Sequence, residues 1–365
     1  MPLVLVDLLF MTGTKGGMEQ YVRSLYAAIA EKPGNLEFVA LASSELAAGD
    51  TSWFPGTVID SGISGENRMA WARGELFSVQ RHAKRLGADL VHCPANLGPA
   101  RRGVPLVLTL HDLLPFRHPE YVPGAYAHVL RLMLRLAARS AQRLVTSSVA
   151  ARDDIVELLG IPAERIDIVP LAGYDNVAAP VTPENGRRLP RQILSVGNRM
   201  PHKNFPRLIE SLLHIPEAER PLLVITGSHG DDPLAQVVAQ FGLEKWVSLR
   251  GWLSAEELDE LFDSSTLVVF PTLFEGFGLP PLEAMSRGCP ALCSDIPVMH
   301  EVAGTAARYV DPYDPAAIGA EIARLLNSPA ELDEMSRAGV ARAAQFSWSR
   351  TADGVLKAFH TVLAR

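Results

Sequence analysis

The sequence has little that would suit a secreted, membrane-spanning or nucleic-acid-binding protein. Its 365 residues include three cysteines, none in a C-x-x-C pair, which excludes a disulfide framework and a zinc ribbon. No apolar run reaches the ~18 residues of a membrane span, and the apolar start, 1–11, lacks the basic region of a signal peptide. The net charge of −7 provides no basic stripe for nucleic acid. We therefore expect a cytoplasmic protein with reduced thiols, no transmembrane segment and no nucleic-acid partner.

Several catalytic motifs are also absent. No two aspartates are spaced D-x-D, so a common metal-chelating pair of nucleotide-sugar enzymes is missing. The sequence contains neither the G-x-G-x-x-G of a dinucleotide site nor a G-K-[ST] phosphate loop. It also lacks the G-x-S-x-G turn of hydrolases. These absences give no reason to expect a metal centre or a bound cofactor.

The order of elements predicts two α/β domains. A chain of this length holds about two domains at ~150 residues each. Short apolar runs alternate with helical patterns such as 18–30, 125–139, 205–213 and 255–262, which indicates parallel sheets with covering helices. A Pro- and Gly-rich stretch, 172–191, separates two sets of strands and is interpreted as a linker. The expected strands are 4–10, 38–41, 90–93, 106–110 and 144–147, then 193–196, 222–226, 247–249, 267–270 and 291–294.

The strongest motif is Glu275-Gly-Phe-Gly-Leu-Pro-Pro-Leu-Glu283, after the strand 267–270. Its glycines let backbone N–H groups come close to a ligand, and Pro280 and Pro281 are typical of a first helical turn. A helix that starts after a glycine loop binds anions, and carboxylates accept hydrogen bonds from hydroxyls. The motif therefore favours a site for a phosphate-bearing, polyhydroxylated ligand over two solvated glutamates beside a turn.

Three weaker motifs follow other expected strands. Arg199 and Lys203 place cations at a strand edge, where they either suit a diphosphate or are plain surface charges. Gly16 and Gly17 open the first helix and suit either a close approach to a ligand or an ordinary βα turn. His111 ends the strand 106–110, where it either contacts a substrate hydroxyl or moves a proton, or is satisfied by its neighbours.

Together these segments resemble family 4 glycosyltransferases of the GT-B fold, over essentially the whole chain. The most specific match is Glu275-x7-Glu283, and the segment 109–115 resembles a bacterial mannosyltransferase-like branch. The resemblance implies two Rossmann-like, doubly wound domains facing across a cleft: 1–175 on the acceptor side and 176–346 for the nucleotide sugar. A C-terminal helix, 347–365, would cross back to the first domain. The matching segments are Gly16–Glu19, His111–Asp112, Gly197–Asn204, Gly251–Leu253 and Glu275–Gly288.

The resemblance also implies a reaction. It is the retaining, metal-independent transfer of a hexose from a GDP-, UDP- or dTDP-linked donor, with mannose from GDP-mannose favoured. The acceptor would be a hydroxyl of a glycan, a lipid-linked molecule or a small molecule, and no cofactor would be needed. Positive charge and helix N–H groups aimed at the leaving diphosphate would supply the catalysis.

The resemblance assigns roles to individual residues. Lys203 and Arg199 would neutralise the diphosphate, and Glu283 would bind the ribose hydroxyls. Gly16 and Gly17 would let the first domain close on the phosphates, and Trp252 and Leu253 lie where the family forms its base pocket. One departure stands out, because Asn198 occupies the position of the family's usual arginine and Arg199 comes one residue later. The donor hexose would be held by Glu275 and the backbone at Phe277, Gly278 and Leu279, with His111 near the reacting face; His111, Glu275 and Lys203 are the expected catalytic residues.

Alternatives remain for the acceptor side and for the function. The basic, leucine-rich helix 126–139 either packs on the sheet, which apolar residues nearly all round favour, or lies on the inner face of a membrane beside a lipid-linked acceptor. The polar stretch 49–68 is interpreted as a loop and a candidate acceptor lid. Rival functions on the same fold are a nucleotide-sugar epimerase and a non-catalytic subunit that binds nucleotide sugar.

Overall fold

The computed structural model describes residues 1–13, 16–122, 124–173, 188–228 and 230–364. The chain divides into two compact units. Unit 1 comprises Met1–Leu171 with Ser347–Arg365, and unit 2 comprises Ala172–Phe346. The predicted divisions lay after 175 and 346. Most of the predicted linker, 174–187, lies outside the described residues.

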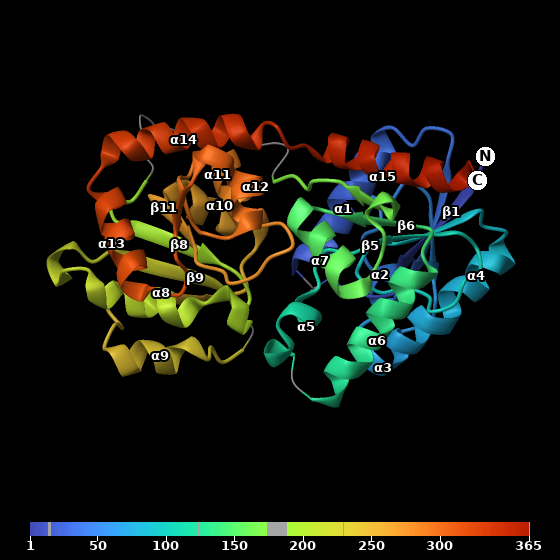
Figure 1. Cartoon of the computed structure of the whole chain (residues 1–365), viewed down its shortest axis with the longest axis horizontal. Helices are drawn as coiled ribbons and strands as arrows, with labels where there is room; N and C mark the ends of the chain where they lie inside the picture. Colours follow the sequence, from blue (N-terminus) through green and yellow to red (C-terminus); the bar gives the residue numbers. More distant parts are fainter. Residues whose placement is uncertain (14–15, 123, 174–187, 229, 365) are drawn as a thin grey trace. The chain divides into compact units, whose positions relative to one another are not determined.

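Unit 1 contains a seven-stranded, wholly parallel sheet of order β3-β2-β1-β4-β5-β6-β7. Its strands β1, β5 and β6 are labelled in Figure 1. The order reverses between β1 and β4, and ligands of doubly wound sheets bind at such a point. The strands are β1 Leu3–Leu8, β2 Glu37–Ala42, β3 Thr57–Asp60, β4 Leu90–Cys93, β5 Leu106–Thr109, β6 Arg143–Thr146 and β7 Ile166–Ile168.

The C-terminal helix belongs to unit 1 and packs on its first helix. The Trp348 ring lies 6.1 Å from that of Tyr21, and the Thr351 hydroxyl donates to the Pro170 carbonyl at 2.8 Å. The helices of the unit are α1 Gly16–Glu31, α2 Ser44–Ala47, α3 Arg68–Arg73, α4 Val79–Leu86, α5 Leu114–Arg117, α6 Ala125–Ser140, α7 Val149–Leu159 and α15 Trp348–Leu363, with a π-helical turn, η1, at Gly74–Ser78.

Unit 2 repeats the plan with a six-stranded parallel sheet of order β10-β9-β8-β11-β12-β13. Its strands are β8 Gln192–Val196, β9 Leu222–Ser228, β10 Val247–Gly251, β11 Leu267–Phe270, β12 Ala291–Ser294 and β13 Arg308–Val310. Its helices are α8 Phe205–Ser211, α9 Leu234–Phe241, α10 Ala255–Ser264, α11 Leu279–Ser286, α12 Pro297–Ala303, α13 Pro315–Leu326 and α14 Pro329–Ala343. The expectation of two Rossmann-like parallel-sheet domains is thus confirmed.

Both faces of the second sheet are buried, which explains its continuous apolar strands. Ile193 and Leu223 pack in one core cluster, whereas the next residues along the chain, Leu194 and Val224, pack in another. Successive strand residues point to opposite faces, so a sheet covered by helices on both sides needs apolar residues at every position.

Three strands were not predicted from the sequence, and all three are sheet edges. They are β3 and β7 in unit 1 and β13 in unit 2. An edge strand is covered less completely, so its sequence need not be apolar throughout, and Thr57 and Asp60 of β3 are exposed. The interpretation of 49–68 as an unbroken loop is therefore wrong, because β3 pairs with β2 within it.

The helix α6 packs against the sheet, as the sequence analysis favoured. Leu134, Ala137 and Ala138 lie in the core of unit 1. In the described part of the chain, no helix is long and apolar enough to cross a membrane. The three cysteines, Cys93, Cys289 and Cys293, are buried free thiols.

Asp7 and Glu75 form a buried acidic pair next to β1, one of the two strands between which the strand order of the first sheet reverses. Glu75, on η1, accepts a hydrogen bond from the Trp71 indole at 2.6 Å. Asp7, on β1, accepts one from the Leu9 N–H at 3.2 Å and faces the Cys93 thiol at 3.5 Å. Burial raises the pKa of both carboxyls, and repulsion from Asp7 raises that of Glu75 further. The pair therefore retains a proton in the folded protein.

We expect the Glu75→Gln variant to melt at a higher temperature than the wild type at alkaline pH. A carboxyl whose pKa is raised on folding loses its stabilising proton as the pH rises from the unfolded value through the folded one. Gln keeps the acceptor for Trp71 and cannot ionise. Thermal melts should show a gain of about 2–4 °C near pH 8, shrinking toward pH 5.

The exposed Glu31 at the end of α1 provides the matched control. The Glu31→Gln variant should follow the wild-type melting curve at every pH. A Glu75→Gln variant that melts below the wild type near pH 8 would contradict the inference that Asp7 and Glu75 retain a proton between them.

Candidate active site

The loop after β8 is held at the carboxyl edge of the second sheet by Asn204. This buried residue adopts a left-handed conformation, with φ of 61°. Its side-chain amide donates to the Pro271 carbonyl at 3.0 Å and to the Pro312 carbonyl at 2.7 Å. Asn204 thereby ties the β8 loop to the segments that follow β11 and β13. The preceding residue, Lys203, is consequently fixed beside the end of β11.

Lys203 and Glu275 form an ion pair, although they are far apart in the sequence. The Lys203 Nζ lies 2.6 Å from Glu275 Oε1, and both side chains are about 13–14% exposed. The Thr272 hydroxyl donates to the same oxygen at 2.9 Å. The carboxylate charge is thus balanced without a ligand, and a more negative group at this position would compete for the ammonium.

The start of α11 presents a short row of free backbone donors. Gly278 occupies the N-cap position of the helix with φ of 108°. Because glycine has no side chain, the first N–H groups of the helix receive no capping hydrogen bond from it. Pro280 and Pro281 have no N–H, so the donors of the first turn are confined to residues 277–279. No acceptor in the described part of the chain takes these three N–H groups. They therefore form an anion-binding row beside Lys203.

Glu283 lies one turn into α11 and is only partly exposed. Burial raises the pKa of its carboxyl to about 7, and repulsion from Asp259 contributes in the same direction. Near neutral pH the carboxyl group of Glu283 is divided between its protonated and ionised forms. The ionised form accepts hydrogen bonds from ligand hydroxyls more strongly, so binding of such a ligand would depend on pH.

The guanidinium of Arg199 is already bonded to other residues of unit 2. Its guanidinium makes a two-point contact with Asp232, with nitrogen–oxygen distances of 2.6–3.1 Å. It also donates to the Gly197 and Thr226 carbonyls at 3.0 and 2.7 Å. The side chain is 9% exposed. This geometry favours a role in fixing the β8 loop, and the predicted phosphate contact stays a prediction.

The segment predicted to line a base pocket follows β10. Trp252 is 50% exposed and Leu253 is partly buried. Ser254 then caps α10 through a reciprocal pair of hydrogen bonds with Glu257. The backbone of 252–253 is thereby fixed at the carboxyl edge of the sheet, the same edge as Lys203 and α11.

Gly16 and Gly17 begin α1 in unit 1, and Gly16 has φ of 55°. The carboxylate of Glu19 accepts from the Thr12 and Gly13 N–H groups at 2.6 and 3.2 Å. Residues 14–15 lie outside the described part. Glu19 is buried and is therefore a positioning residue for Thr12 and Gly13.

His111 lies at the carboxyl edge of the first sheet as a neutral imidazole. Its Nε2 is 2.9 Å from the Pro94 carbonyl, which can only accept, so this nitrogen carries the proton. Burial lowers the pKa of His111 to about 4, against the opposing effect of that hydrogen bond. The ring stands edge-on to Tyr21 at 4.6 Å. In the described part of the chain no group bonds Nδ1, which is left as an acceptor.

Sequence reasoning gave no role to four residues that shape these sites. Asn204 had a weak signal, because Asn is a common non-glycine residue in the left-handed region. Glu19 stood in the first turn of a predicted helix, where acids are common. Asp232 and Thr272 carried no signal, since only the fold brings them to Arg199 and Glu275.

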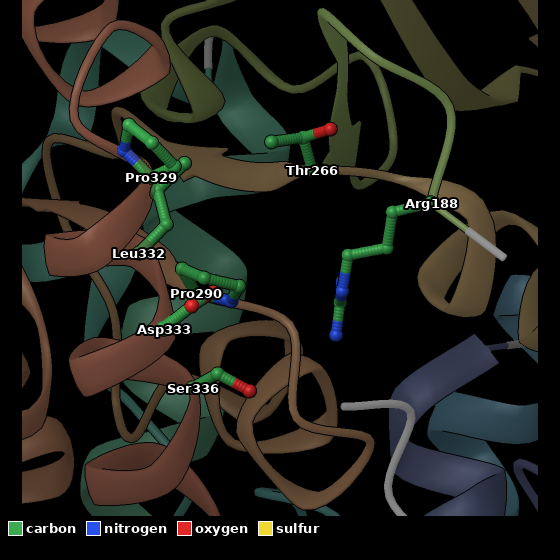
Figure 2. A pocket seen from close by; sticks show the side chains of 7 residues that line it. All are labelled: Arg188, Thr266, Pro290, Pro329, Leu332, Asp333 and Ser336. Atoms are coloured by element: carbon green, nitrogen blue, oxygen red, sulfur yellow. The ribbon is translucent and has the colours of Figure 1, made fainter. Parts of the chain in front are cut away.

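Unit 2 also contains a cavity of about 190 Å³, which none of the residues of this site lines. Figure 2 shows the side chains that line it. Thr266 precedes β11 and Pro290 precedes β12, so the cavity lies at the amino edge of the sheet. Ligands of such sheets bind at the carboxyl edge. The other lining residues are Arg188, Pro329, Leu332, Asp333 and Ser336.

Comparison with known proteins identifies the class. Residues 15–172 match the family model "Glycosyltransferase Family 4", and residues 184–342 match "Glycosyl transferases group 1". The protein is a glycosyltransferase of family 4 with the GT-B fold. The resemblance inferred from the motifs is thereby confirmed.

Its relatives include bacterial mannosyltransferases. The chain is 32% identical over 303 residues to O-antigen chain mannosyltransferase B of Escherichia coli, covering 80% of this chain and 77% of the relative. It is 30% identical over 313 residues to the MMP alpha-(1->4)-mannosyltransferase of Mycolicibacterium hassiacum, covering 81% and 73%.

Solved structures share the fold over the whole chain. Sucrose-phosphate synthase from Thermosynechococcus elongatus aligns with a TM-score of 0.78 at 16% identity, covering all of both chains. HepE of Anabaena, in complex with UDP and glucose, aligns with a TM-score of 0.75 at 17% identity, covering 99% of this chain and 100% of HepE.

Proposed function

We propose that this glycosyltransferase transfers mannose from GDP-mannose, with retention of configuration and without a metal ion, to a hydroxyl of a glycan, a lipid-linked molecule or a small molecule. The observation that carries the proposal is the Lys203–Glu275 ion pair, 2.6 Å long, beside the free N–H row of α11. The names of the two mannosyltransferase relatives support the sugar. UDP and glucose in HepE support a nucleotide-sugar donor for this fold.

The leaving diphosphate would bind where Lys203 and the start of α11 provide positive charge and N–H donors. Negative charge grows on it as the glycosyl bond breaks, and Lys203 with the N–H groups of 277–279 neutralises that charge. Because a cation and a helix start already face this position, the proposal requires no metal. Once Lys203 turns to the diphosphate, Glu275 is released to accept hydrogen bonds from the sugar hydroxyls.

The arrangement favours front-side attack over a covalent intermediate. Glu275 accepts the Thr272 hydroxyl and, with the donor bound, would accept sugar hydroxyls as well, and a carboxylate that accepts these hydrogen bonds is a poor nucleophile. In the proposal the acceptor oxygen bonds the anomeric carbon on the side that the diphosphate leaves, and the departing phosphate oxygen takes the acceptor's proton. His111, neutral with Nδ1 free to accept, orients a sugar hydroxyl instead of transferring a proton.

A donor panel tests this function directly. The protein is incubated with EDTA, methyl α-mannoside as a simple acceptor hydroxyl, and GDP-mannose, UDP-glucose, dTDP-glucose or ADP-glucose. Nucleotide release and the anomeric NMR signals of the products are recorded. We expect release from GDP-mannose first, with an α-linked product. Release that requires added Mg²⁺ or Mn²⁺ would overturn metal independence, and a β-linked product would overturn retention. The epimerase alternative would yield a new nucleotide sugar and no free nucleotide.

We expect the affinity for the donor to increase as the pH rises through about 7. Glu283 has a pKa of about 7 because it is buried, and its ionised form accepts ribose hydroxyls more strongly than the protonated form. Titration calorimetry with GDP-mannose should show a gain of several-fold between about pH 6 and pH 8, since both donor phosphates remain singly ionised there.

Two variants check that Glu283 causes this dependence. Glu283→Gln should bind more weakly and equally at both pH values. The exposed Glu334 on α14 is the matched control, and Glu334→Gln should keep the wild-type dependence. A pH dependence that survives in Glu283→Gln would assign it to another group.

A further inference from the structure

One surface of unit 1 combines cations with exposed apolar side chains, and we propose that it docks the protein on the anionic surface of a phospholipid bilayer. We call it the basic–apolar surface. It consists of the outer faces of α3, η1, α4 and α6, which carry Met69, Arg73, Phe77, Arg81, Arg85, Leu132, Arg135 and Arg139.

The first stripe of this surface runs along α3, η1 and α4. Exposed residues recur at every fourth position from Met69 to Arg85. Apolar and cationic types alternate as far as Arg81, and Arg85 adds a further cation. Met69 is 79% exposed and Phe77 is 56% exposed. Residues four apart share one face of a helical segment, so Phe77 stands between Arg73 and Arg81.

The second stripe is the outer face of α6. Leu132 is 55% exposed, and Arg135 and Arg139 are exposed at the same helical face. The opposite face contributes Leu134 and Ala138 to the core. Leu132 therefore points outward among cations. Because Leu132 does not contribute to the core, packing does not explain an apolar residue at this position.

An apolar cavity joins the two stripes. It has a volume of about 330 Å³, and Met69, Trp71 and Ala72 of α3 line it together with Val129, Leu130 and Met133 of α6 and Leu97. The two helices thus lie side by side (Figure 1). Val129, at the edge of the cavity, is itself 54% exposed. A lining of hydrocarbon, thioether and indole suits inserted acyl chains better than water.

The charges of this surface have no acidic partners. In the described part of the chain, none of the five exposed arginines forms an ion pair, and Glu75, the only acid on these helices, is buried. Several arginines elsewhere do pair with acids, among them Arg117, Arg143, Arg199, Arg287, Arg308 and Arg324. In a protein of net charge −7, unpaired cations in one place indicate an anionic partner.

The apolar residues decide what that partner is. A nucleic acid would be met by cations and stacking aromatics, and an acidic protein by a polar rim. A bilayer takes both components of this surface: its headgroups attract the arginines, and its interface accepts Met69, Phe77 and Leu132. Docking does not depend on the donor chemistry, and it would bring unit 1 to an acceptor that is itself held in a membrane.

Vesicle sedimentation of the full chain tests the proposal. We expect binding to vesicles of 70% phosphatidylcholine and 30% phosphatidylglycerol at low salt, and little binding to phosphatidylcholine alone. Each cation near an anionic surface changes the partition coefficient by about fivefold. The triple variant Arg73→Gln, Arg81→Gln, Arg85→Gln should therefore bind about 100-fold more weakly, and Phe77→Ser with Leu132→Ser at least roughly tenfold more weakly.

Matched controls come from unit 2. Arg324→Gln removes an exposed arginine that is paired with acids, and Tyr313→Ser removes a side chain that is 57% exposed; both should bind vesicles like the wild type. The substituted positions are exposed, and equal melting temperatures would confirm folding. The proposal is overturned if the wild type ignores the anionic vesicles, if the controls lose as much binding, or if Phe77→Ser with Leu132→Ser binds normally. Nucleotide release from the donor is measured separately, so loss of docking and loss of transfer are distinguishable.

Discussion

The Lys203→Ala variant is expected to transfer sugar about 100-fold to 1,000-fold more slowly than the wild type. Loss of one preorganised charge or donor at a developing anion costs a factor of this size. Lys203 is mostly buried, and Asn204 fixes its position, while Arg199 of the same loop is held by Asp232. Steady-state kinetics with GDP-mannose should show most of the loss in kcat, because the charge on the diphosphate is greatest in the transition state.

The control for this experiment is Lys245→Ala, which removes an exposed lysine from the same unit. It should keep wild-type kinetics. The Glu275→Gln variant adds a second check, since it removes the ion pair but keeps a hydrogen-bonding side chain. If Lys203→Ala retained a tenth or more of the wild-type kcat, Lys203 would not be the group that stabilises the leaving diphosphate.

The Gly278→Ala variant is expected to lose donor binding by a factor of at least about ten. A Cβ at this residue would lie 2.4 Å from Met299 Cε, and φ of 108° is strained for any L side chain. Relief of that strain, about 1–3 kcal/mol, would shift the N–H groups of 277–279. Since misplaced donors hold an anion poorly, calorimetry should report a weaker GDP-mannose complex.

The Gly242→Ala variant is a control that introduces the same kind of backbone strain away from the candidate donor site. Gly242 caps α9 with φ of 64°, and a Cβ there would meet nothing within 4 Å. This variant should melt at a slightly lower temperature and bind donor normally. Equal binding by both variants would place the donor away from the start of α11.

The strands show which parts of the fold follow from local sequence. Buried strands such as β4, β11 and β12 occur at their predicted residues, because a strand covered on both faces must be apolar throughout. The edge strands β3, β7 and β13 were missed, because partial exposure removes that pattern.

The site was predicted as far as motifs reach. The glycine-proline segment before α11 indicated free N–H groups, and the structure has them at residues 277–279. Arg199 shows the limit of a local motif, because nothing in the sequence around Arg199 indicates its ion pair with Asp232. The partner of a charged side chain is set by distant residues, which a local motif does not contain.

The sequence by itself determined the class of this protein. The alternating strands and helices specify two parallel sheets, and Glu275-x7-Glu283 is the most specific match to family 4. Periodicity and glycine placement act locally, so they can be read along the chain. Only the tertiary structure decided that Lys203 pairs with Glu275, that His111 is neutral, and that Met69, Phe77 and Leu132 are exposed beside unpaired arginines. Pairing, burial and exposure depend on which residues the fold brings together, and that information is distributed over the whole chain.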